Sequence, residues 1–325
     1  MRHVDGGPSL FIDAEPAPAS VAREVAEGLA SQPPSLPPKL FYDERGSILF
    51  DEICRLDEYY PTRTETAIMQ DFVEEMADAI GSGAVVIEYG SGSSLKTEAL
   101  LSALHEPEAY LPIDISREHL LRSAARIAHR HPELKVLPVC ADYTSAIPGL
   151  AEFAASRRSV VYFPGSTIGN FEPSEAQDFL GRIARLVGPG GGLLIGVDLR
   201  KDPCVLESAY NDAKGVTAAF NLNMLRHIND RLGPTFELDA FQHRAVWNDS
   251  DSRIEMHLVA SRPTQVRVNG HALAFETGER IVTEHSYKFT RAGFAELAGR
   301  AGWTVQRVWT DPQELFSVQY LSAGS

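Results

Sequence analysis

The feature that most restricts the fold of this chain is a regular alternation of short apolar segments and helical segments between residues 84 and 198. The apolar segments, which we expect to be strands, are 84–88, 110–113, 135–139, 159–163 and 193–197. Helical stretches at 96–104, 116–129 and 174–187 separate most of them, which is the spacing of βαβ units. Because such units place their strands parallel and their helices on both faces, the sequence predicts an α/β fold with a mostly parallel sheet.

The segments on either side of this alternation follow other patterns. Helical spacing predicts helices at 21–30, 47–55 and 64–80, and a mostly helical chain over 205–232. Strands are expected as a hairpin at 236–247 and 253–260, at 265–268 and 280–289, and as a closing pair at 303–310 and 316–321 after a helix at 290–301.

These patterns predict two lobes. Residues 64–199 and 287–325 would form the domain that binds a cofactor, and residues 20–63 and 200–286 a second, α+β lobe that binds the substrate. The first 19 residues are rich in proline, glycine, alanine and acids, so we expect a disordered arm there.

Composition argues against several classes of protein. The 325 residues carry a net charge of −14, whereas binding of nucleic acid or of an anionic membrane would need clustered lysine and arginine. No apolar run reaches the roughly 18 residues of a membrane helix. The cysteines, Cys54, Cys140 and Cys204, form neither a disulfide framework nor a CxxC pair, which indicates reduced thiols in a cytoplasmic protein. The ten histidines show no metal-ligand cluster, so we predict no metal, and we expect a monomer.

A glycine turn marks the carboxyl end of the first expected strand. Glu88-Tyr89-Gly90-Ser91-Gly92 follows the strand and opens a helix, so its backbone is able to approach a ligand at the edge of the sheet. A dinucleotide fingerprint would have a third glycine or alanine where this chain has Leu95, which weakens the rival reading of an NAD-dependent oxidoreductase. The acid Glu88 suits a cationic or zwitterionic ligand better than a pyrophosphate.

Acidic residues follow the next two strands. Asp114 is placed to accept hydrogen bonds from both ribose hydroxyls, and Asp142 to meet an adenine amino group. A glycine turn, a ribose acid and an adenine acid on consecutive strands are typical of methyltransferases that bind S-adenosylmethionine (SAM). An alternative is that the glycines only make a tight turn and that both acids cap helices. A non-catalytic regulator that binds SAM would carry the same pattern.

Four separated blocks carry a resemblance to a known family. They are Leu36-Pro37-Pro38-Lys39-Leu40-Phe41-Tyr42-Asp43, Glu58-Tyr59-Tyr60-Pro61-Thr62-Arg63-Thr64-Glu65, Gly165-Ser166-Thr167-Ile168-Gly169-Asn170-Phe171 and Thr283-Glu284-His285-Ser286-Tyr287-Lys288-Phe289. With these blocks the chain resembles, from about residue 20 to residue 322, the L-histidine Nα-methyltransferases of ergothioneine biosynthesis. The resemblance implies a class I SAM-dependent methyltransferase fold, whose mostly parallel sheet is closed by an antiparallel strand. It also implies trimethylation of the α-amino group of histidine to hercynine, with release of S-adenosylhomocysteine.

The resemblance assigns residues to the cofactor. Asp114 would bind the ribose, and Asp142 with Tyr143 the adenine, although phenylalanine is commoner in the family at position 143. Gly90 and Lys96 would touch the same molecule. The full set that we expect to bind SAM is Glu88, Gly90, Ser91, Gly92, Lys96, Asp114, Asp142, Tyr143 and Gly165.

The resemblance also assigns a substrate site. The residues that we expect to bind histidine are Tyr59, Asn170, Tyr210, Met256, Glu284 and Ser286. Asn170 and Tyr210 would hold its α-carboxylate and amino end. Glu284 and Ser286 would meet the donor and the acceptor of its imidazole, and Met256 would flank the ring. Asn170 and Glu284 would then contact one histidine at the mouth of the adenosyl pocket.

The chemistry asks little of the protein beyond alignment. Methyl transfer from a sulfonium is an in-line displacement, and an α-amino group with a pKa of about 8 loses its proton without a dedicated strong base. Tyr42, expected beside the amine, and Tyr59 are the expected catalytic residues, because their rings stabilise methylammonium character by cation–π contact. For two of these residues a purely structural role stays open. Glu284 could be a surface acid in a salt bridge, and Asn170 could cap the helix near Glu172. Another amino acid, such as tryptophan, is the leading rival substrate.

Overall fold

The computed structural model describes residues 12–14, 18–92, 95–268 and 270–324. Contacts among the described residues divide the chain into two compact units. Unit 1 consists of Met1–Glu15, Pro61–Arg200 and Lys288–Ser325, and unit 2 of Pro16–Tyr60 and Lys201–Tyr287. The assignment of SAM to one lobe and of histidine to the other stays a prediction from the sequence.

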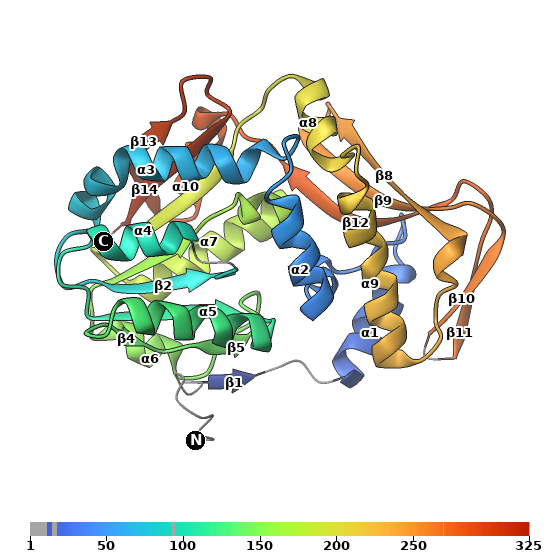
Figure 1. Cartoon of the computed structure of the whole chain (residues 1–325), viewed down its shortest axis with the longest axis horizontal. Helices are drawn as coiled ribbons and strands as arrows, with labels where there is room; N and C mark the ends of the chain where they lie inside the picture. Colours follow the sequence, from blue (N-terminus) through green and yellow to red (C-terminus); the bar gives the residue numbers. More distant parts are fainter. Residues whose placement is uncertain (1–11, 15–17, 93–94, 269, 325) are drawn as a thin grey trace. The chain divides into compact units, whose positions relative to one another are not determined.

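Unit 1 is built on a sheet that has nine strands among the described residues (Figure 1). Its order is β1-β5-β3-β2-β6-β7-β14-β13, with β4 paired to β3. The strands are β1 (Ile12–Ala14), β2 (Val85–Tyr89), β3 (Ala109–Asp114), β4 (Lys135–Val136), β5 (Val139–Ala141), β6 (Ser159–Phe163), β7 (Gly192–Asp198), β13 (Trp303–Thr310) and β14 (Phe316–Ala323). All pairs are parallel except those of β14, which runs antiparallel to both β7 and β13. The predicted α/β fold, with its mostly parallel sheet and closing antiparallel strand, is confirmed.

Helices cover both faces of this sheet, because both faces of its central strands are apolar. The helices α3, α4 and α5 pack on one face, and α6, α7 and α10 on the other. Their bounds are α3 (Tyr60–Ile80), α4 (Leu95–Ala103), α5 (Arg117–Arg130), α6 (Leu150–Ala155), α7 (Pro173–Val187) and α10 (Arg291–Arg300). A sheet fixed in this way on both sides holds the carboxyl ends of its parallel strands, and the residues that follow them, in defined positions.

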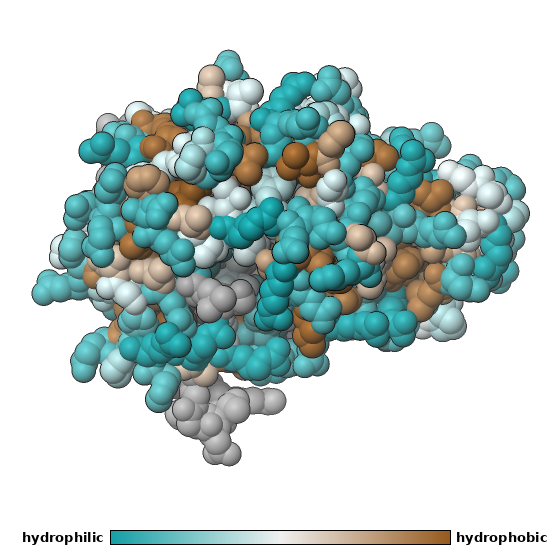
Figure 2. Space-filling view, turned by 45° about the horizontal axis from the view of Figure 1, so that its top comes forward, coloured by the Kyte–Doolittle hydropathy of each residue, from teal (hydrophilic) through white to brown (hydrophobic). Residues whose placement is uncertain are grey.

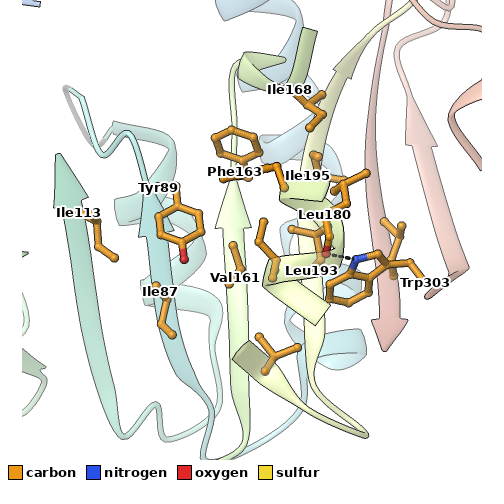
Figure 3. Packing of buried hydrophobic residues seen from close by; sticks show 14 of the residues in the cluster. Ile87, Tyr89, Ile113, Val161, Phe163, Ile168, Leu180, Leu193, Ile195 and Trp303 are labelled. Atoms are coloured by element: carbon orange, nitrogen blue, oxygen red, sulfur yellow. Dashed lines mark hydrogen bonds between the residues drawn. The ribbon is translucent and has the colours of Figure 1, made fainter. Parts of the chain in front are cut away.

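Figure 3 shows the face that α7 covers. Ile87, Val161 and Leu193 project from the neighbouring strands β2, β6 and β7, and all of them are fully buried. Trp303 of β13 donates its indole N–H to the carbonyl oxygen of Leu180 in α7, over 2.9 Å. This bond satisfies a polar atom that the surrounding apolar core would otherwise leave without a partner.

Parts of unit 1 differ from the expectation. The expected strand 135–139 is divided into β4 and β5, both paired with β3, because Pro138 lies between them and has no N–H to donate. The expected disordered arm of residues 1–19 contains β1, which pairs in parallel with β5, and α1 begins at Pro18. The other residues of that arm lie outside the part of the chain that the structure describes.

Unit 2 combines helices with small antiparallel sheets. Its three-stranded sheet has the order β12-β9-β8, and β10 pairs with β11 in a separate hairpin. The elements are α1 (Pro18–Leu29), η1 (Pro38–Phe41), α2 (Glu44–Ile53), α8 (Pro203–Tyr210), α9 (Val216–Leu232), η3 (Leu238–Ala240), β8 (Phe241–Asn248), β9 (Arg253–Ala260), β10 (Thr264–Val268), β11 (His271–Phe275) and β12 (Arg280–Tyr287). The expected hairpin therefore exists as β8 and β9.

The mostly helical stretch expected over 205–232 consists of two helices, α8 and α9. The Asp212 carboxylate accepts hydrogen bonds from the backbone N–H groups of Val216 (2.9 Å) and Thr217 (2.8 Å). These contacts satisfy donors that the first turn of α9 leaves open, so they stabilise a new helix start there. Gly215, with φ of 73°, provides the left-handed backbone that connects the two helices.

The surface in Figure 2 is mostly hydrophilic on the visible face, with hydrophobic residues scattered between. Ile48, Val205 and Val308 are the large apolar side chains that lie more than a third exposed in the described part of the chain. Within that part, no helix has both the length and the apolar character needed to span a membrane.

Candidate active site

The glycine turn lies where β2 ends, at the carboxyl edge of the sheet. Gly90 and Gly92 both have positive φ, 71° and 42°, which explains why glycine occupies these positions. The backbone N–H of Gly90 donates to the carbonyl oxygen of Ile113 at 2.9 Å, which ties the turn to β3. A side chain added at Gly90 would first meet the ring of Tyr143, at 3.9 Å. The turn and the expected adenine residue are therefore neighbours.

Asp114 ends β3 directly beside this turn. Its Oδ1 accepts from the backbone N–H of Ser116 at 2.9 Å, and its Oδ2 accepts from that of Gly92 at 3.4 Å. Burial raises the pKa of this carboxyl, while the two backbone N–H groups favour its ionised form. The contacts fix a hydrogen-bond acceptor beside the turn, which is the position that a ribose acid requires.

Asp142 and Tyr143 follow β5 and form the third part of the site. Asp142 Oδ1 accepts from both the backbone N–H (2.9 Å) and the hydroxyl (2.5 Å) of Thr144, which orients the carboxylate. The Tyr143 ring packs against Tyr89 (centroids 5.5 Å apart) and Phe163 (6.0 Å). These rings provide an apolar surface of the kind on which a flat purine packs. The structure thus brings the three expected elements together on one edge of the sheet, while their contact with SAM stays a prediction.

Glu88 lies beneath the turn and is only 1% exposed. Its carboxylate accepts hydrogen bonds from the Thr97 hydroxyl, at 2.8 and 2.9 Å, and from the Tyr110 hydroxyl. Burial raises its pKa to about 8, an effect that these two hydroxyls and Lys96 partly offset. These partners orient the carboxyl group under the turn, and its expected contact with SAM stays a prediction.

Glu65 is a residue of this region that the sequence reasoning missed. Its fully buried carboxylate forms an ion pair with Lys96 and accepts the backbone N–H of Gly165 at 3.0 Å through both oxygens. It therefore connects two residues that we expected independently to bind SAM. Glu65 lies inside one of the four family blocks, but a glutamate at a helix start gives no sign by itself that it contacts a residue 100 positions away.

The loop after β6 carries Gly165 and Asn170. Gly165 (φ 77°) and Ser166 (φ 58°) are both left-handed, and the Ser166 hydroxyl accepts the backbone N–H of Asp198 at 2.8 Å. Asn170 is the last residue of the short helix η2 (Thr167–Asn170). The N-cap of the next helix, α7, is Glu172, so the alternative that Asn170 caps this helix is wrong.

Three of the expected substrate residues share one face of the small sheet in unit 2, and a fourth contacts them from helix α8. Met256 of β9 lies directly opposite Glu284 of β12, and Ile254 opposite Ser286. Directly opposite residues of an antiparallel pair share a face, so Met256, Glu284 and Ser286 do so. The hydroxyls of Tyr210 and Ser286 are 2.8 Å apart. Glu284 is 8% exposed, and its interpretation as a surface acid is therefore wrong.

The expected catalytic tyrosines belong to an aromatic group in the same unit. The ring of Tyr59 lies 6.2 Å from that of Tyr210 and 6.4 Å from that of Phe50, which in turn lies 5.8 Å from Tyr42. Burial, followed by the nearby Tyr210 and other ionisable groups that include Glu284, raises the pKa of Tyr59 well above its ordinary value. Tyr59 is thus a neutral phenol at physiological pH and not a base.

Asn170 belongs to unit 1, whereas the other expected substrate residues belong to unit 2. The common contact of Asn170 and Glu284 with one histidine stays a prediction. Among the described residues, no group of three or more histidine, cysteine, aspartate or glutamate side chains is arranged to hold a metal ion. The cysteines Cys54, Cys140 and Cys204 are free thiols.

Comparison with known proteins assigns the chain to a family. The model of the family described as histidine-specific, SAM-dependent methyltransferases matches residues 21–323. The chain belongs to this family. The methyltransferase activity and the cofactor that the sequence predicted are thereby confirmed, and the NAD-dependent oxidoreductase is set aside.

Three known proteins are similar to this methyltransferase over most of their length. Histidine N-alpha-methyltransferase of Mycolicibacterium smegmatis is 41% identical over 307 residues, which cover 93% of this chain and 94% of the relative. The protein of the same name from Mycobacterium tuberculosis is 43% identical over 298 residues, 90% and 91% of the two chains. A 4-dimethylallyltryptophan N-methyltransferase of Aspergillus fumigatus is 27% identical over 310 residues, also 90% and 91%.

Proposed function

We propose that this methyltransferase converts L-histidine to hercynine, by three successive transfers of a methyl group from SAM to the α-amino nitrogen, as the first step of ergothioneine biosynthesis. The observation that carries the proposal is the group on the face of the β9–β12 pair, where Glu284 lies opposite Met256, and Ser286 contacts Tyr210. A carboxylate and a hydroxyl two residues apart are able to meet both nitrogens of an imidazole.

Glu284 supplies the selectivity in this proposal. Glu284 is buried, so a competing amino acid with an aliphatic or phenyl side chain would bring no hydrogen-bond donor to a carboxylate that is shielded from water. Sites that hydrogen-bond a substrate group reject analogues lacking it by factors of roughly 10⁴. Met256 offers the imidazole an apolar neighbour on the same face.

The backbone and carboxylate groups of unit 1 would hold SAM. In the proposal, Asp114 binds the ribose, Asp142 and Tyr143 the adenine, and the turn at Gly90 and Lys96 the rest of the molecule. Glu88, Ser91, Gly92 and Gly165 complete the set of cofactor residues. The hydrogen bonds of Asp114 and Asp142 described above support these roles, because they orient both acceptors at the carboxyl edge of the sheet.

Each transfer forms an N–CH₃ bond and breaks the S–CH₃ bond of the sulfonium, whose electron pair stays on sulfur as S-adenosylhomocysteine leaves. The α-nitrogen loses a proton before each transfer. Water suffices as the acceptor, because the pKa of an α-amino group is about 8. Asn170 and Tyr210 would hold the amino-acid end. The rings of Tyr42 and Tyr59 would stabilise the quaternary ammonium product, which has no N–H left to donate.

The enzyme would act as a monomer in a reducing compartment such as the cytoplasm. The free thiols of Cys54, Cys140 and Cys204 support the compartment, since none of them forms a disulfide. Gel filtration with light scattering should give the mass of one chain, 35.6 kDa.

The proposal is tested by mass spectrometry of each of the twenty amino acids after incubation with the enzyme and SAM. Histidine should yield mono-, di- and trimethylated species, with the trimethylated one accumulating. Turnover of tryptophan without turnover of histidine would overturn the substrate. Binding of SAM without methylation of any amine would favour a regulator instead.

A further inference from the structure

His243 of β8 connects the predicted substrate site to the helices that cover it. Its Nε2 lies 2.8 Å from the carbonyl oxygen of Tyr210, and its Nδ1 lies 2.9 Å from the side-chain Nδ2 of Asn221 in α9. The same Nδ2 lies 3.1 Å from the carbonyl oxygen of His257 in β9. None of the family blocks contains His243 or Asn221, and neither residue entered the sequence prediction.

This network fixes the tautomer of His243. A carbonyl oxygen only accepts, so Nε2 carries the proton that is donated to Tyr210. The amide nitrogen of Asn221 only donates, so Nδ1 of His243 is the acceptor. Turning the amide of Asn221 around would place its oxygen against the carbonyl oxygen of His257, which the contact of 3.1 Å forbids. Burial also lowers the pKa of His243, which favours the same neutral ring.

The contact with Tyr210 matters because Tyr210 is the last residue of α8. The last carbonyl groups of a helix have no partner within the helix, so the Nε2–H of His243 completes this end. Asn211 fastens the same end to β8, accepting the N–H of Ala245 and donating to its carbonyl oxygen, each at 3.1 Å. The position of Tyr210 is therefore set from β8.

His243 also shares a sheet face with the predicted imidazole site. It lies opposite Leu258, whereas Ala245, two residues further along β8, lies opposite Met256. Residues two apart on a strand point to the same side, so His243 lies on the face of Met256 and Glu284. His257 lies opposite Arg244 and so points to the other face.

We propose that His243, held as the Nε2–H tautomer by Asn221, is a positioning residue that places the Tyr210 hydroxyl for the amino-acid end of histidine. The inference rests on the proposed role of Tyr210 in substrate binding. His243 itself contacts no reacting atom, and acts through the backbone of Tyr210.

Two substitutions separate the two nitrogens of the ring. In His243→Asn the side-chain oxygen takes the place of Nδ1, but the donor to Tyr210 is lost. In His243→Gln the amide nitrogen reaches the position of Nε2 and restores that donor. We expect His243→Asn to raise KM for histidine roughly threefold to tenfold, the effect of one lost hydrogen bond, with kcat within about twofold. His243→Gln should recover most of the loss, and Kd for SAM should stay unchanged in both.

His257→Gln is the matched control, because it removes a buried histidine from the neighbouring strand on the opposite face. It should lower the melting temperature without raising KM for histidine. ¹⁵N spectra of the wild-type enzyme supply a test that needs no variant: His243 should show a protonated Nε2 and a bare Nδ1. A protonated Nδ1 would overturn the proposal.

Tyr210→Phe distinguishes the two levels of the argument. If it raises KM for histidine while His243→Asn behaves like His257→Gln, the inference about His243 is wrong and the proposed function stands. If Tyr210→Phe leaves KM unchanged, the proposed substrate site is wrong, and with it the role of His243.

Discussion

The hydroxyl of Tyr210 lies 2.8 Å from the hydroxyl of Ser286, so the last residue of helix α8 is joined to strand β12. Both side chains are buried, with exposed fractions of 7% and 4%. In our account Tyr210 meets the amino-acid end of histidine and Ser286 its imidazole. One hydrogen bond therefore sets the distance between the groups that bind the two ends of the substrate.

Glu284→Ala should raise KM for histidine roughly 100-fold or more, because the imidazole loses a buried, charged partner. The affinity for SAM should stay within about twofold, since SAM is expected to bind unit 1. Initial rates and calorimetric titration with SAM measure the two effects. Glu284→Gln keeps the shape of the side chain, so its KM for histidine should lie between those of Glu284→Ala and the wild type. Equal losses of histidine and SAM binding in Glu284→Ala would contradict the division of roles.

Asp114→Ala should have the opposite effect. The substitution removes the acceptor that Gly92 and Ser116 orient, so Kd for SAM should rise by about tenfold or more, whereas KM for histidine at saturating SAM should change little. Asp78→Ala is the control for loss of a carboxylate, because its side chain is 77% exposed. If Asp114→Ala bound SAM with wild-type affinity, the proposed role of Asp114 in binding the ribose would be wrong.

Glu65→Gln should weaken SAM binding by roughly tenfold, because it removes the charge that holds Lys96 and places an amide N–H against either Lys96 or the N–H of Gly165. If Glu65 acts through Lys96, the Kd values of Glu65→Gln, Lys96→Met and the double variant should not be additive. Titration with SAM gives all of them. Additive effects would show that the two residues act independently.

Glu88 predicts a dependence of stability on pH. Burial raises its pKa from an ordinary 4.5 to about 8, so between these pH values the folded state holds a proton that the unfolded state has lost. The free energy of unfolding should therefore fall as pH rises through this window, by at most about 1.4 kcal/mol per pH unit. Glu88→Gln has no such titration. The melting temperature of this variant, measured relative to that of the wild type, should therefore rise from pH 5 to pH 8. Glu118 is exposed, so for Glu118→Gln the difference in melting temperature from the wild type should not change with pH. The same constant difference for Glu88→Gln would contradict the assignment of the pH dependence to Glu88.

The order of elements could be predicted from the sequence because its signals are local. Apolar runs and helical spacing gave the strands β2, β3, β6 and β7 to within about two residues of their observed ends. The expected strand 135–139 was wrong in that Pro138 divides it into β4 and β5. The boundary between α8 and α9, where Asp212 stabilises the start of α9, was not resolved within the expected helical stretch. The helix α6 and the strand β11 were missed, because both are short and lie between turn residues.

The residues of the candidate site could be predicted from the sequence only where residue type and position indicate a role. A glycine turn and the acids Asp114 and Asp142 do so, because they follow strands of one parallel sheet. Glu65 and His243 do not, because their roles depend on contacts with Gly165 and Tyr210, which are 100 and 33 residues away. No periodicity or spacing records such contacts.

The most direct test of the account is a crystal structure of the enzyme with L-histidine and S-adenosylhomocysteine. We predict the imidazole nitrogens on Glu284 and Ser286, the α-carboxylate and amino group on Asn170 and Tyr210, and the α-nitrogen in line with the sulfur. A histidine bound with its imidazole away from Glu284, or without contact to Asn170, would contradict the proposed site.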